Sequence, residues 1–502
     1  IKELLNKKYD REEWKIFTHK IFGNIDYFKT PKKIETKNDK ILEFVQIGNL
    51  KLEDKKNISL FELKLIKDLN IYKNKVELRN IVTKFIDQYS NHGVLVVFDN
   101  QGRDFRLTFS SKFSEFDEEG NIIEKETPSK RYTYLLGENE SCATAAERFH
   151  LLYNQKNNLT IKDMLNAFNV EKITDEFFNT YKKLYLKLYD EINGLRIKDK
   201  NIGNTFKKNK ISTEEFSKKI MGQLVFIYFL QKKGWLGIKK NQDNVFEKWG
   251  SGDKNFVKNL FKKEYCNYDN FFNDVLEPLF IAFSTDLPEN YYSKLDTKIP
   301  FLNGGLFDPL KNYDWLDTKI NISNELFSEI IENFEIYNFT IQEEDPEEKE
   351  VAIDPEMLGK VFENLLEIKD KKSKGTFYTP RKIAKYICDE SLKNFLINYF
   401  GEDSRVNFDN FFNNIIDKDL DKFLKSNYQK IDDKLKNIKI CDPAIGSGEF
   451  PVELMNLCVL TRLRLNNYFN DNKRTSYLMK RNFIKNSIYG VDIEDSAVET
   501  AK

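Results

Sequence analysis

A chain of 502 residues with 40% hydrophobic content is too long for one hydrophobic core, and its length predicts about three domains. Lys plus Arg and Asp plus Glu are equal at 80 each, so the net charge is zero. This balance excludes a protein that is drawn to nucleic acid or anionic lipid by its overall charge, and any charged partner must be bound locally.

Cysteine and histidine usage narrows the chemistry further. The five cysteines are far apart and form no CxxC pair, and the chain has only three histidines, which argues against a disulfide framework, a zinc cluster or a His-based catalytic site. No apolar run approaches the roughly 20 residues that span a bilayer. We therefore expect a soluble protein of the reducing cytoplasm, without a membrane partner.

The first region, residues 1–140, is predicted to be an α/β domain. An N-terminal amphipathic helix precedes the runs ILEFVQIGNLKL, ISLFELKL, HGVLVVFD and DFRLTFSSKF, which are rich in β-branched and aromatic residues and are separated by charged turns. Within ISLFELKL, Glu62 and Lys64 are two residues apart on one strand. Both side chains therefore point to the same face of the expected sheet.

This pair resembles the ExK element of PD-(D/E)xK nucleases, in which a carboxylate binds Mg²⁺ and a lysine orients or activates the attacking water. Asp54 is the candidate second carboxylate, because the more usual upstream position, near Gln46, holds no acid. The alternative interpretation is a solvated strand face in a lysine-rich protein. The candidate catalytic residues are thus Asp54, Glu62 and Lys64, with Asp54 and Glu62 as the metal ligands.

Residues 141–342 are predicted to form a helical connector. Apolar residues recur at helical spacing in TAAERFHLLYN, FSKKIMGQLVFIYFLQKKG and NFVKNLFKKEY. The segment LVFIYFLQ is apolar almost all round, which indicates a centrally buried helix. The acidic run QEEDPEEKE then indicates a solvated linker to the third region, residues 343–502.

The third region contains the stretch NIKICDPAIGSGEFPVELM, residues 437–455, which predicts a strand, a glycine-rich turn and a helix. Gly446 and Gly448 would let backbone amides approach a ligand without interference from a Cβ. The turn lacks the GxxxxGK pattern of a P-loop, and Pro451 stands where a dinucleotide fingerprint requires its third glycine. The usual phosphate-binding interpretations are therefore disfavoured.

About forty residues further on, SIYGVDIEDSAVETAK predicts a second strand that ends at Asp492 and is followed by a helix. An acid at this position can accept hydrogen bonds from the hydroxyls of a ribose, and Ile493 can cover an adenine ring. The expected ligand therefore contains a nucleoside.

These motifs resemble those of S-adenosylmethionine-dependent DNA adenine-N6 methyltransferases of the gamma class. DPAIGSGEF resembles motif I, YGVDIEDSAVETAK resembles motif II, and GTFYTP, which precedes both, resembles motif X. The resemblance implies a doubly wound Rossmann-like domain in which motif X walls the methionine end of the cofactor, motif I binds its amino acid part and motif II holds the ribose. The implied cofactor-binding residues are Phe377, Tyr378, Thr379, Pro380, Asp442, Pro443, Ala444, Gly446, Ser447, Gly448, Asp492 and Ile493. Glu449 departs from the small or hydroxyl residue that is common after the turn, which leaves the role of its side chain open.

The motif that presents a flipped adenine in these enzymes, Asn or Asp followed by Pro, Pro and an aromatic residue, does not occur in the chain. The sequence stops at Lys502, inside the helix expected after the second strand. We therefore expect an N-terminal fragment that is inactive as a methyltransferase by itself. The DNA sequence to be recognised cannot be inferred, because the elements that contact bases are absent.

The order of an α/β block, a helical connector, motif X and motif I resembles that of single-chain type IIG restriction-modification enzymes. The resemblance implies a site-specific DNA adenine-N6 methyltransferase with a fused Mg²⁺-dependent endonuclease, which uses S-adenosylmethionine and Mg²⁺ and binds double-stranded DNA in bacterial restriction-modification. The alternatives are a methyltransferase whose N-terminal domain only binds DNA, and a degenerate cofactor-sensing subunit that works with a partner. The predicted fold class is α/β plus α, and the oligomeric state is left open.

Overall fold

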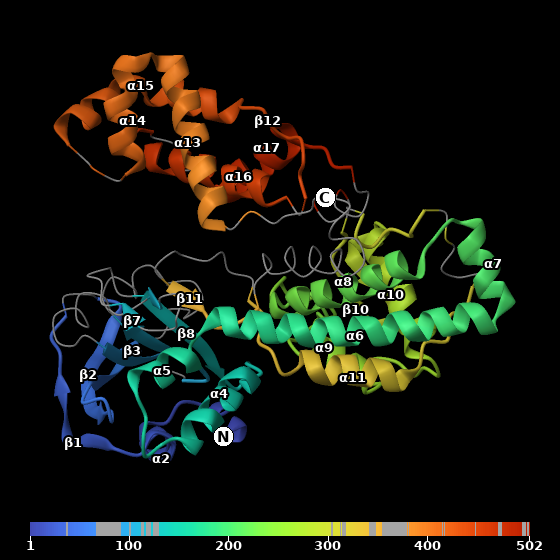
Figure 1. Cartoon of the computed structure of the whole chain (residues 1–502), viewed down its shortest axis with the longest axis horizontal. Helices are drawn as coiled ribbons and strands as arrows, with labels where there is room; N and C mark the ends of the chain where they lie inside the picture. The colour runs from blue at the N-terminus through green and yellow to red at the C-terminus, as the bar shows by residue number, and fades with distance from the viewer. Residues whose placement is uncertain are drawn as a thin grey trace. The chain divides into compact units, whose positions relative to one another are not determined.

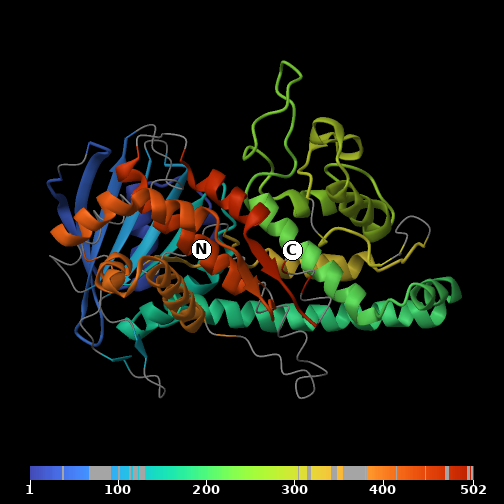
Figure 2. The same ribbon diagram turned by 90° about the horizontal axis from the view of Figure 1, so that it is seen from above.

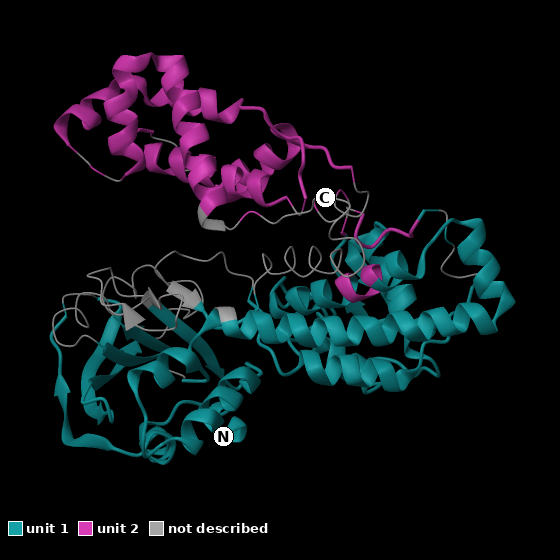
Figure 3. Ribbon diagram, viewed as in Figure 1, with its two compact units in different colours: residues 1–217, 223–301, 311–355 teal, residues 218–222, 302–310, 356–502 magenta. Residues whose placement is uncertain are grey.

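The structure is a computed structural model, drawn in Figure 1 and from above in Figure 2. It describes residues 1–36, 39–66, 92–99, 102–111, 115–116, 122–123, 130–302, 305–311, 313, 318–340, 348–353, 379, 381–413, 415, 417–446, 448–469, 474–493, 498 and 501. The chain divides into two compact units (Figure 3). Unit 1 comprises residues 1–217, 223–301 and 311–355, and unit 2 comprises residues 218–222, 302–310 and 356–502.

Unit 1 contains a mixed sheet that follows helices α1 (Lys2–Leu5) and α2 (Arg11–Phe22). Seven strands within the described residues form it, in the order β1-β2-β3-β4-β5-β8-β11. Their bounds are β1 Ile25–Lys33, β2 Ile41–Lys51, β3 Asn57–Leu65, β4 His92–Phe98, β5 Asp104–Ser111, β8 Lys130–Gly137 and β11 Glu348–Glu350. The pairs β3·β4 and β8·β11 are parallel and the other neighbours are antiparallel. The short strands β6 (Glu115–Phe116) and β7 (Ile122–Ile123) pair with each other.

The strands fall on the predicted apolar runs, so the expectation of an α/β fold in this region is confirmed. Strands β3 and β4 lie inside the sheet and are buried along nearly their whole length. Strands that are covered on both faces have nearly continuous apolar sequences, as SLFELKL and GVLVVF do. Glu62 is the exception within β3, because its charged side chain is only 1% exposed.

The rest of unit 1 is largely helical, as the spacing of its apolar residues predicts. The helices are α4 Ala143–Asn154, α5 Ile161–Ala167, α6 Val170–Lys198, α7 Lys200–Lys208, α8 Thr213–Lys232, α9 Phe256–Phe261, α10 Glu277–Ser284 and α11 Asn324–Phe334. Shorter elements are η1 Phe272–Leu276, η2 Pro288–Asn290, η3 Ser293–Leu295, β9 Tyr291–Tyr292 and β10 Thr297–Lys298. In both views α6 runs from beside the sheet along this helical part (Figures 1 and 2).

Helix α8 contains the segment LVFIYFLQ that the sequence places in the core. Leu224, Val225, Ile227 and Tyr228 are each no more than 2% exposed. The predicted central burial of this helix is therefore confirmed.

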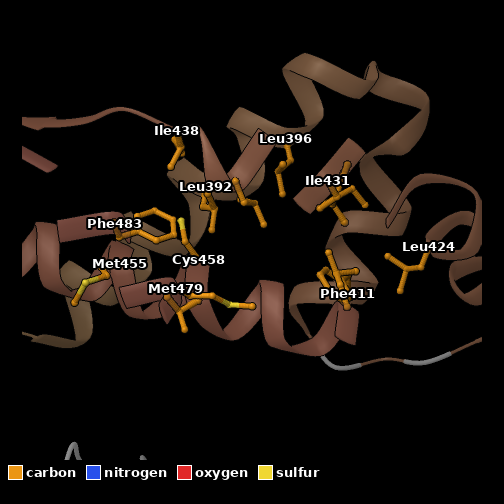
Figure 4. Close-up of a cluster of buried hydrophobic side chains, with 14 of the residues drawn as sticks. Leu392, Leu396, Phe411, Leu424, Ile431, Ile438, Met455, Cys458, Met479 and Phe483 are labelled. Carbon is orange, nitrogen blue, oxygen red and sulfur yellow. The ribbon is translucent and has the colours of Figure 1, made fainter. Parts of the chain in front are cut away.

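Unit 2 is described from residue 379 onward, apart from short gaps and the segments 218–222 and 302–310. Its elements are α13 Arg381–Phe400, η4 Glu402–Ser404, α14 Arg405–Phe412, α15 Lys418–Lys436, β12 Ile440–Asp442, α16 Glu449–Arg464, η5 Leu465–Tyr468, α17 Ser476–Asn486 and β13 Ile488–Gly490. Side chains from the α-helices interlock in one apolar core that includes Leu396, Ile431, Cys458 and Phe483 (Figure 4). Strands β12 and β13 pair in parallel as a two-stranded sheet in the described part of the unit.

Across the described residues, no helix combines the length and apolarity needed to cross a membrane.

A buried ion cluster ties three parts of unit 2 together. Asp432 on α15 receives hydrogen bonds from Arg462 Nε on α16 at 2.8 Å and from Arg474 Nη1 at 2.9 Å, and it is 4% exposed. Burial alone would raise the pKa of Asp432, but the hydrogen bonds from Arg474 and Arg462 outweigh it and hold that pKa below its usual range. The carboxylate therefore stabilises the fold in its charged form.

We expect Asp432→Asn to lower the free energy of unfolding of unit 2 by about 3 kcal/mol at neutral pH, because two arginines lose their buried counter-charge. Since the folded-state pKa is depressed, the stabilisation is present above the ordinary Asp pKa and is lost as the pH falls through the lowered value. The gap between wild type and variant should therefore narrow in acid. Hydrogen exchange of the α15 and α16 amides under increasing denaturant measures this free energy. The control is Asp433→Asn, at an exposed neighbouring position. Equal losses in both variants would contradict a stabilising role for charged Asp432.

Candidate functional site

The predicted ligand-binding turn of unit 2 follows β12 and is tied to the end of β13. Val491 N–H donates to Asp442 O at 2.9 Å, and Ile445 N–H donates to Val491 O at 2.9 Å. Gly446 N–H donates to Asp492 Oδ2 at 2.9 Å. The structure therefore brings Asp442, the turn and Asp492, which are about fifty residues apart in sequence, to one edge of the two-stranded sheet.

Two glycines in the turn have backbone angles that other residues adopt with strain. Gly446 has φ of +52° and Gly448 has φ of +86°. A Cβ added to Gly446 would meet no atom of the described residues within 4 Å. The space beside Gly446 is therefore open, as a turn that admits a ligand close to its backbone requires.

A third glycine, Gly490, was not singled out by the sequence. A Cβ at this position would lie 2.0 Å from Cδ1 of Ile445, so the turn packs directly against the end of β13. The signal in the sequence was the YGVD stretch, in which a glycine interrupts an otherwise β-branched and aromatic strand.

Asp442 has one carboxylate oxygen that accepts no hydrogen bond from the described residues. Its Oδ1 accepts from Ala444 N–H at 3.0 Å, while its Oδ2 is buried and has no hydrogen-bond partner among the described residues. A buried acceptor without a donor is unfavourable, so a ligand that supplies an N–H would stabilise it. Pro443 and Ala444, which follow Asp442, are exposed.

Of the remaining cofactor-binding candidates, the structure describes only Ile493 and Thr379. Ile493 is 95% exposed and Thr379 is half-buried. Phe377, Tyr378, Pro380 and Ser447 lie outside the described residues.

The surroundings of the turn are acidic. Cys388 on α13 is buried, with its Sγ 3.8 Å from Phe450 O at the start of α16. Burial raises the pKa of Cys388 to about 12, and the carboxylates of Glu453, Asp389, Glu449 and Asp442 add to the rise. Four carboxylates therefore lie near Cys388 and the start of α16.

The second candidate site is on β2 and β3 in unit 1. Glu43 is the cross-strand partner of Lys64, and Glu62 is two residues before Lys64. Directly opposed residues, and residues two apart on one strand, share a face of the sheet. Glu43, Glu62 and the half-buried Lys64 therefore project from the same face, with the two carboxylates on neighbouring strands.

Both carboxylates are bridged by Arg11, the first residue of α2. Arg11 Nε donates to Glu62 Oε2 at 2.5 Å, and Arg11 Nη2 donates to Glu43 Oε2 at 3.0 Å. Tyr9 Oη donates to the other oxygen of Glu62 at 2.5 Å. Burial raises the pKa of Glu62, and the Tyr9 hydrogen bond and the Arg11 charge oppose that rise.

Asp54 does not lie beside Glu62. It is exposed in the turn between β2 and β3, where Oδ2 accepts from Ile161 N–H at 3.1 Å and Oδ1 accepts from Lys56 N–H at 3.4 Å. The last pair of the hairpin is Lys51 with Asn57, and the five residues from Asn57 to Glu62 span roughly 17 Å. The structure therefore brings Glu43, and not Asp54, to Glu62 and Lys64.

Glu43 could not be recognised from the sequence as a neighbour of Glu62, because only the pairing register of β2 with β3 brings the two residues together. Counting back from Glu62 along the chain does not show which residue of β2 faces it, since a shift of one residue would turn the side chain to the other face. Among the described residues no group of three or more Asp, Glu, His or Cys side chains is close enough to hold a metal ion. Glu43 and Glu62 are two carboxylates that Arg11 bridges.

The resemblance to restriction-modification enzymes implies two sites. One is a set of carboxylates on a mixed sheet, and the other is a strand, a turn and a helix with an acid beside the turn. No family model matches the chain. The chain is 29% identical over 368 residues to a protein of Methanocaldococcus jannaschii named "Putative type II restriction enzyme and methyltransferase RM.MjaORFECS2P". The match covers 66% of this chain and 29% of that protein, so the chain spans less than a third of its relative. The resemblance to proteins that join a restriction enzyme and a methyltransferase is thereby confirmed.

Among solved structures, the chain matches the type IIL restriction-modification enzyme MmeI in complex with DNA, at 14% identity and a TM-score of 0.35. The match covers 63% of this chain and 35% of that one. At this TM-score the overlap is too slight to assign a fold.

The close packing of Gly490 against Ile445 yields a test of the turn. We expect Gly490→Ala to destabilise the turn by about 2 kcal/mol through overpacking, and to speed hydrogen exchange at the Ile445 and Val491 amides. Adding Ile445→Ala removes the Cδ1 and Cγ1 that meet the new methyl and should restore part of the protection. Unchanged exchange in the single variant would mean that the turn does not pack in this way.

Proposed function

We propose that the chain is part of a restriction-modification enzyme, a site-specific DNA adenine-N6 methyltransferase with a fused Mg²⁺-dependent endonuclease. The relative named as a type II restriction enzyme and methyltransferase supports the general role. The observation that carries the methyltransferase half is the open turn at Gly446 beside Asp442 Oδ2, which no described residue bonds. In this proposal residues 1–140 are the nuclease domain, 141–342 the connector and 343–502 the start of a Rossmann-like methyltransferase domain.

The residues of the turn fit S-adenosylmethionine, which would supply the methyl group when bound. Asp442 Oδ2 would accept a hydrogen bond from the ammonium of the methionine part, and the Gly446 backbone would lie against it without a Cβ. Asp492 would exchange its bond to Gly446 N–H for the ribose hydroxyls, and Ile493 would cover the adenine. The acidic surroundings suit the two positive charges of this cofactor, its ammonium and its sulfonium.

The cofactor assignment predicts that Gly446→Val abolishes S-adenosylmethionine binding, because the added side chain enters the open space beside the turn. Gly401→Val is the matched control: Gly401 also has positive φ, at +93°, and a Cβ there also meets nothing within 4 Å in the described part of the chain, but it follows α13 outside the turn. Titration calorimetry on the full-length protein should show at least a tenfold loss of affinity for Gly446→Val alone. Equal affinity in both folded variants would refute the assignment.

The nuclease half of the proposal uses Glu43, Glu62 and Lys64. Two carboxylates on adjacent strands can bind Mg²⁺, which takes one or two carboxylates together with substrate phosphates and water. When bound, the ion would polarise the scissile phosphate and activate water. Lys64, on the same face and one pleat further along β3, would orient the attacking water. Asp54 is replaced by Glu43 as the second ligand in this proposal.

We therefore predict that Glu43→Gln, Glu62→Gln and Lys64→Ala each reduce Mg²⁺-dependent DNA cleavage by at least about a hundredfold, since metal and lysine contribute several kcal/mol to the transition state. Asp54→Asn should cleave normally, because the amide retains an oxygen for Ile161 N–H. Both activities are measured in the complete enzyme, and methylation of the same duplex DNA by each variant reports that the protein is folded. Loss of cleavage in Asp54→Asn with full cleavage in Glu43→Gln would restore the assignment made from the sequence.

A further inference from the structure

Arg11 occupies the position between Glu43 and Glu62 where the proposed function requires a divalent cation. Its guanidinium contacts one oxygen of each carboxylate, at 2.5 Å for Glu62 and 3.0 Å for Glu43. The Glu62 carboxylate is 1% exposed, so without a cation its charge would be buried and unpaired. Arg11 thus supplies in the protein itself a positive charge that neutralises the site.

Arg11 and a metal ion cannot share Glu62 Oε2 without strong repulsion. Mg²⁺ must contact a ligand oxygen directly, at about 2.0–2.1 Å. An ion at that distance from an oxygen that also accepts from Arg11 Nε at 2.5 Å would place two cations within roughly 4 Å of each other, beside a carboxylate that is only 1% exposed. Binding of one cation therefore opposes binding of the other.

The two donors to Glu62 differ in their freedom to leave. The ring of Tyr9 packs against Phe98 and Phe105 with centroids 4.4 Å and 5.3 Å away, and its backbone N–H donates to Gly102 O at 2.7 Å. Tyr9 is therefore a fixed donor to Glu62 Oε1. The Arg11 side chain is 30% exposed, and its partner Glu43 is 42% exposed, so the guanidinium lies at the rim of the site and can withdraw into solvent.

The backbone of Arg11 does not need to move for this exchange. Asp10 caps α2 by accepting from Glu12 N–H at 2.9 Å and Glu13 N–H at 3.0 Å, which fixes the helix start. The long arginine side chain can then change rotamer on a stationary helix end, while Tyr9 keeps the Glu62 carboxylate oriented with Oε2 available.

We propose that Arg11 is an internal counter-cation that holds Glu43 and Glu62 together in the metal-free protein, and that metal binding at these carboxylates requires its withdrawal. This inference rests on the proposed nuclease function. Arg11 is a positioning residue in it, and it sets the metal concentration at which the site fills.

The test is Mn²⁺ binding to the 502-residue chain, measured by titration calorimetry and by the loss of the free-ion electron paramagnetic resonance signal. We expect Arg11→Met to bind Mn²⁺ about tenfold more tightly than wild type, because a competing unit charge is removed. Arg11→Lys, which keeps the charge, should stay close to wild type. The control variant is Arg405→Met, which also removes an arginine paired with a glutamate, because Arg405 pairs with Glu402 at 2.8 Å in unit 2. This variant should bind Mn²⁺ with wild-type affinity.

Thermal unfolding gives a readout that is independent of cleavage. In chelator, Arg11→Met should unfold at a lower temperature than wild type, and added Mg²⁺ should raise its midpoint more than that of wild type. Unchanged or weaker Mn²⁺ binding by folded Arg11→Met, when Glu62→Gln still abolishes that binding, would overturn the inference and leave the nuclease site standing. Absence of any Glu62-dependent Mn²⁺ binding in wild type and Arg11→Met would refute the nuclease site and the inference together.

Discussion

Glu62 carries a charge into a strand whose neighbouring positions are apolar, and a buried carboxylate is tolerated only where hydrogen bonds and an opposite charge replace water. That requirement explains why the N-terminal segment packs where it does. Tyr9, just before the N-cap of α2, and Arg11, the first residue of α2, satisfy both oxygens of Glu62, and Arg11 also contacts Glu43. Glu62 thus links the start of α2 to β3, and Arg11 extends the link to Glu43 on β2.

The strands and helices of unit 1 could be predicted because each has a local pattern. GVLVVF is an uninterrupted run of apolar residues between turn residues, and LVFIYFLQ is apolar on all sides of a helix. The partner of Glu62 could not be predicted in the same way. Asp54 is close to Glu62 in sequence, whereas Glu43 is close through the pairing of β2 with β3, which depends on contacts that a single stretch of sequence does not contain.

The site in unit 2 follows the opposite pattern. Asp442, Gly446 and Asp492 could be named from sequence because a strand, a glycine turn and an acid after the next strand are local motifs with one common geometry. The hydrogen bonds of the turn could not be predicted from local sequence. Asp492 accepts from Gly446 N–H across forty-six residues, and Asp442 Oδ2 is left without a partner among the described residues. Gly490 could not be predicted for the same reason, since its close packing involves Ile445 from another segment.

Helix α6 connects the sheet of unit 1 to α7. Its 29 residues form a continuous rod about 44 Å long that begins at Val170, three residues after Ala167, whose carbonyl accepts a hydrogen bond from Tyr134 of β8 at 2.5 Å. The near end of the rod is thus anchored to the sheet. A tilt of about 5° at that anchor would displace the far end by about 4 Å, from the length of the rod alone. A change in the direction of α6 at the sheet would therefore be largest at α7, which begins at Lys200 directly after the C-cap of the rod, Asp199.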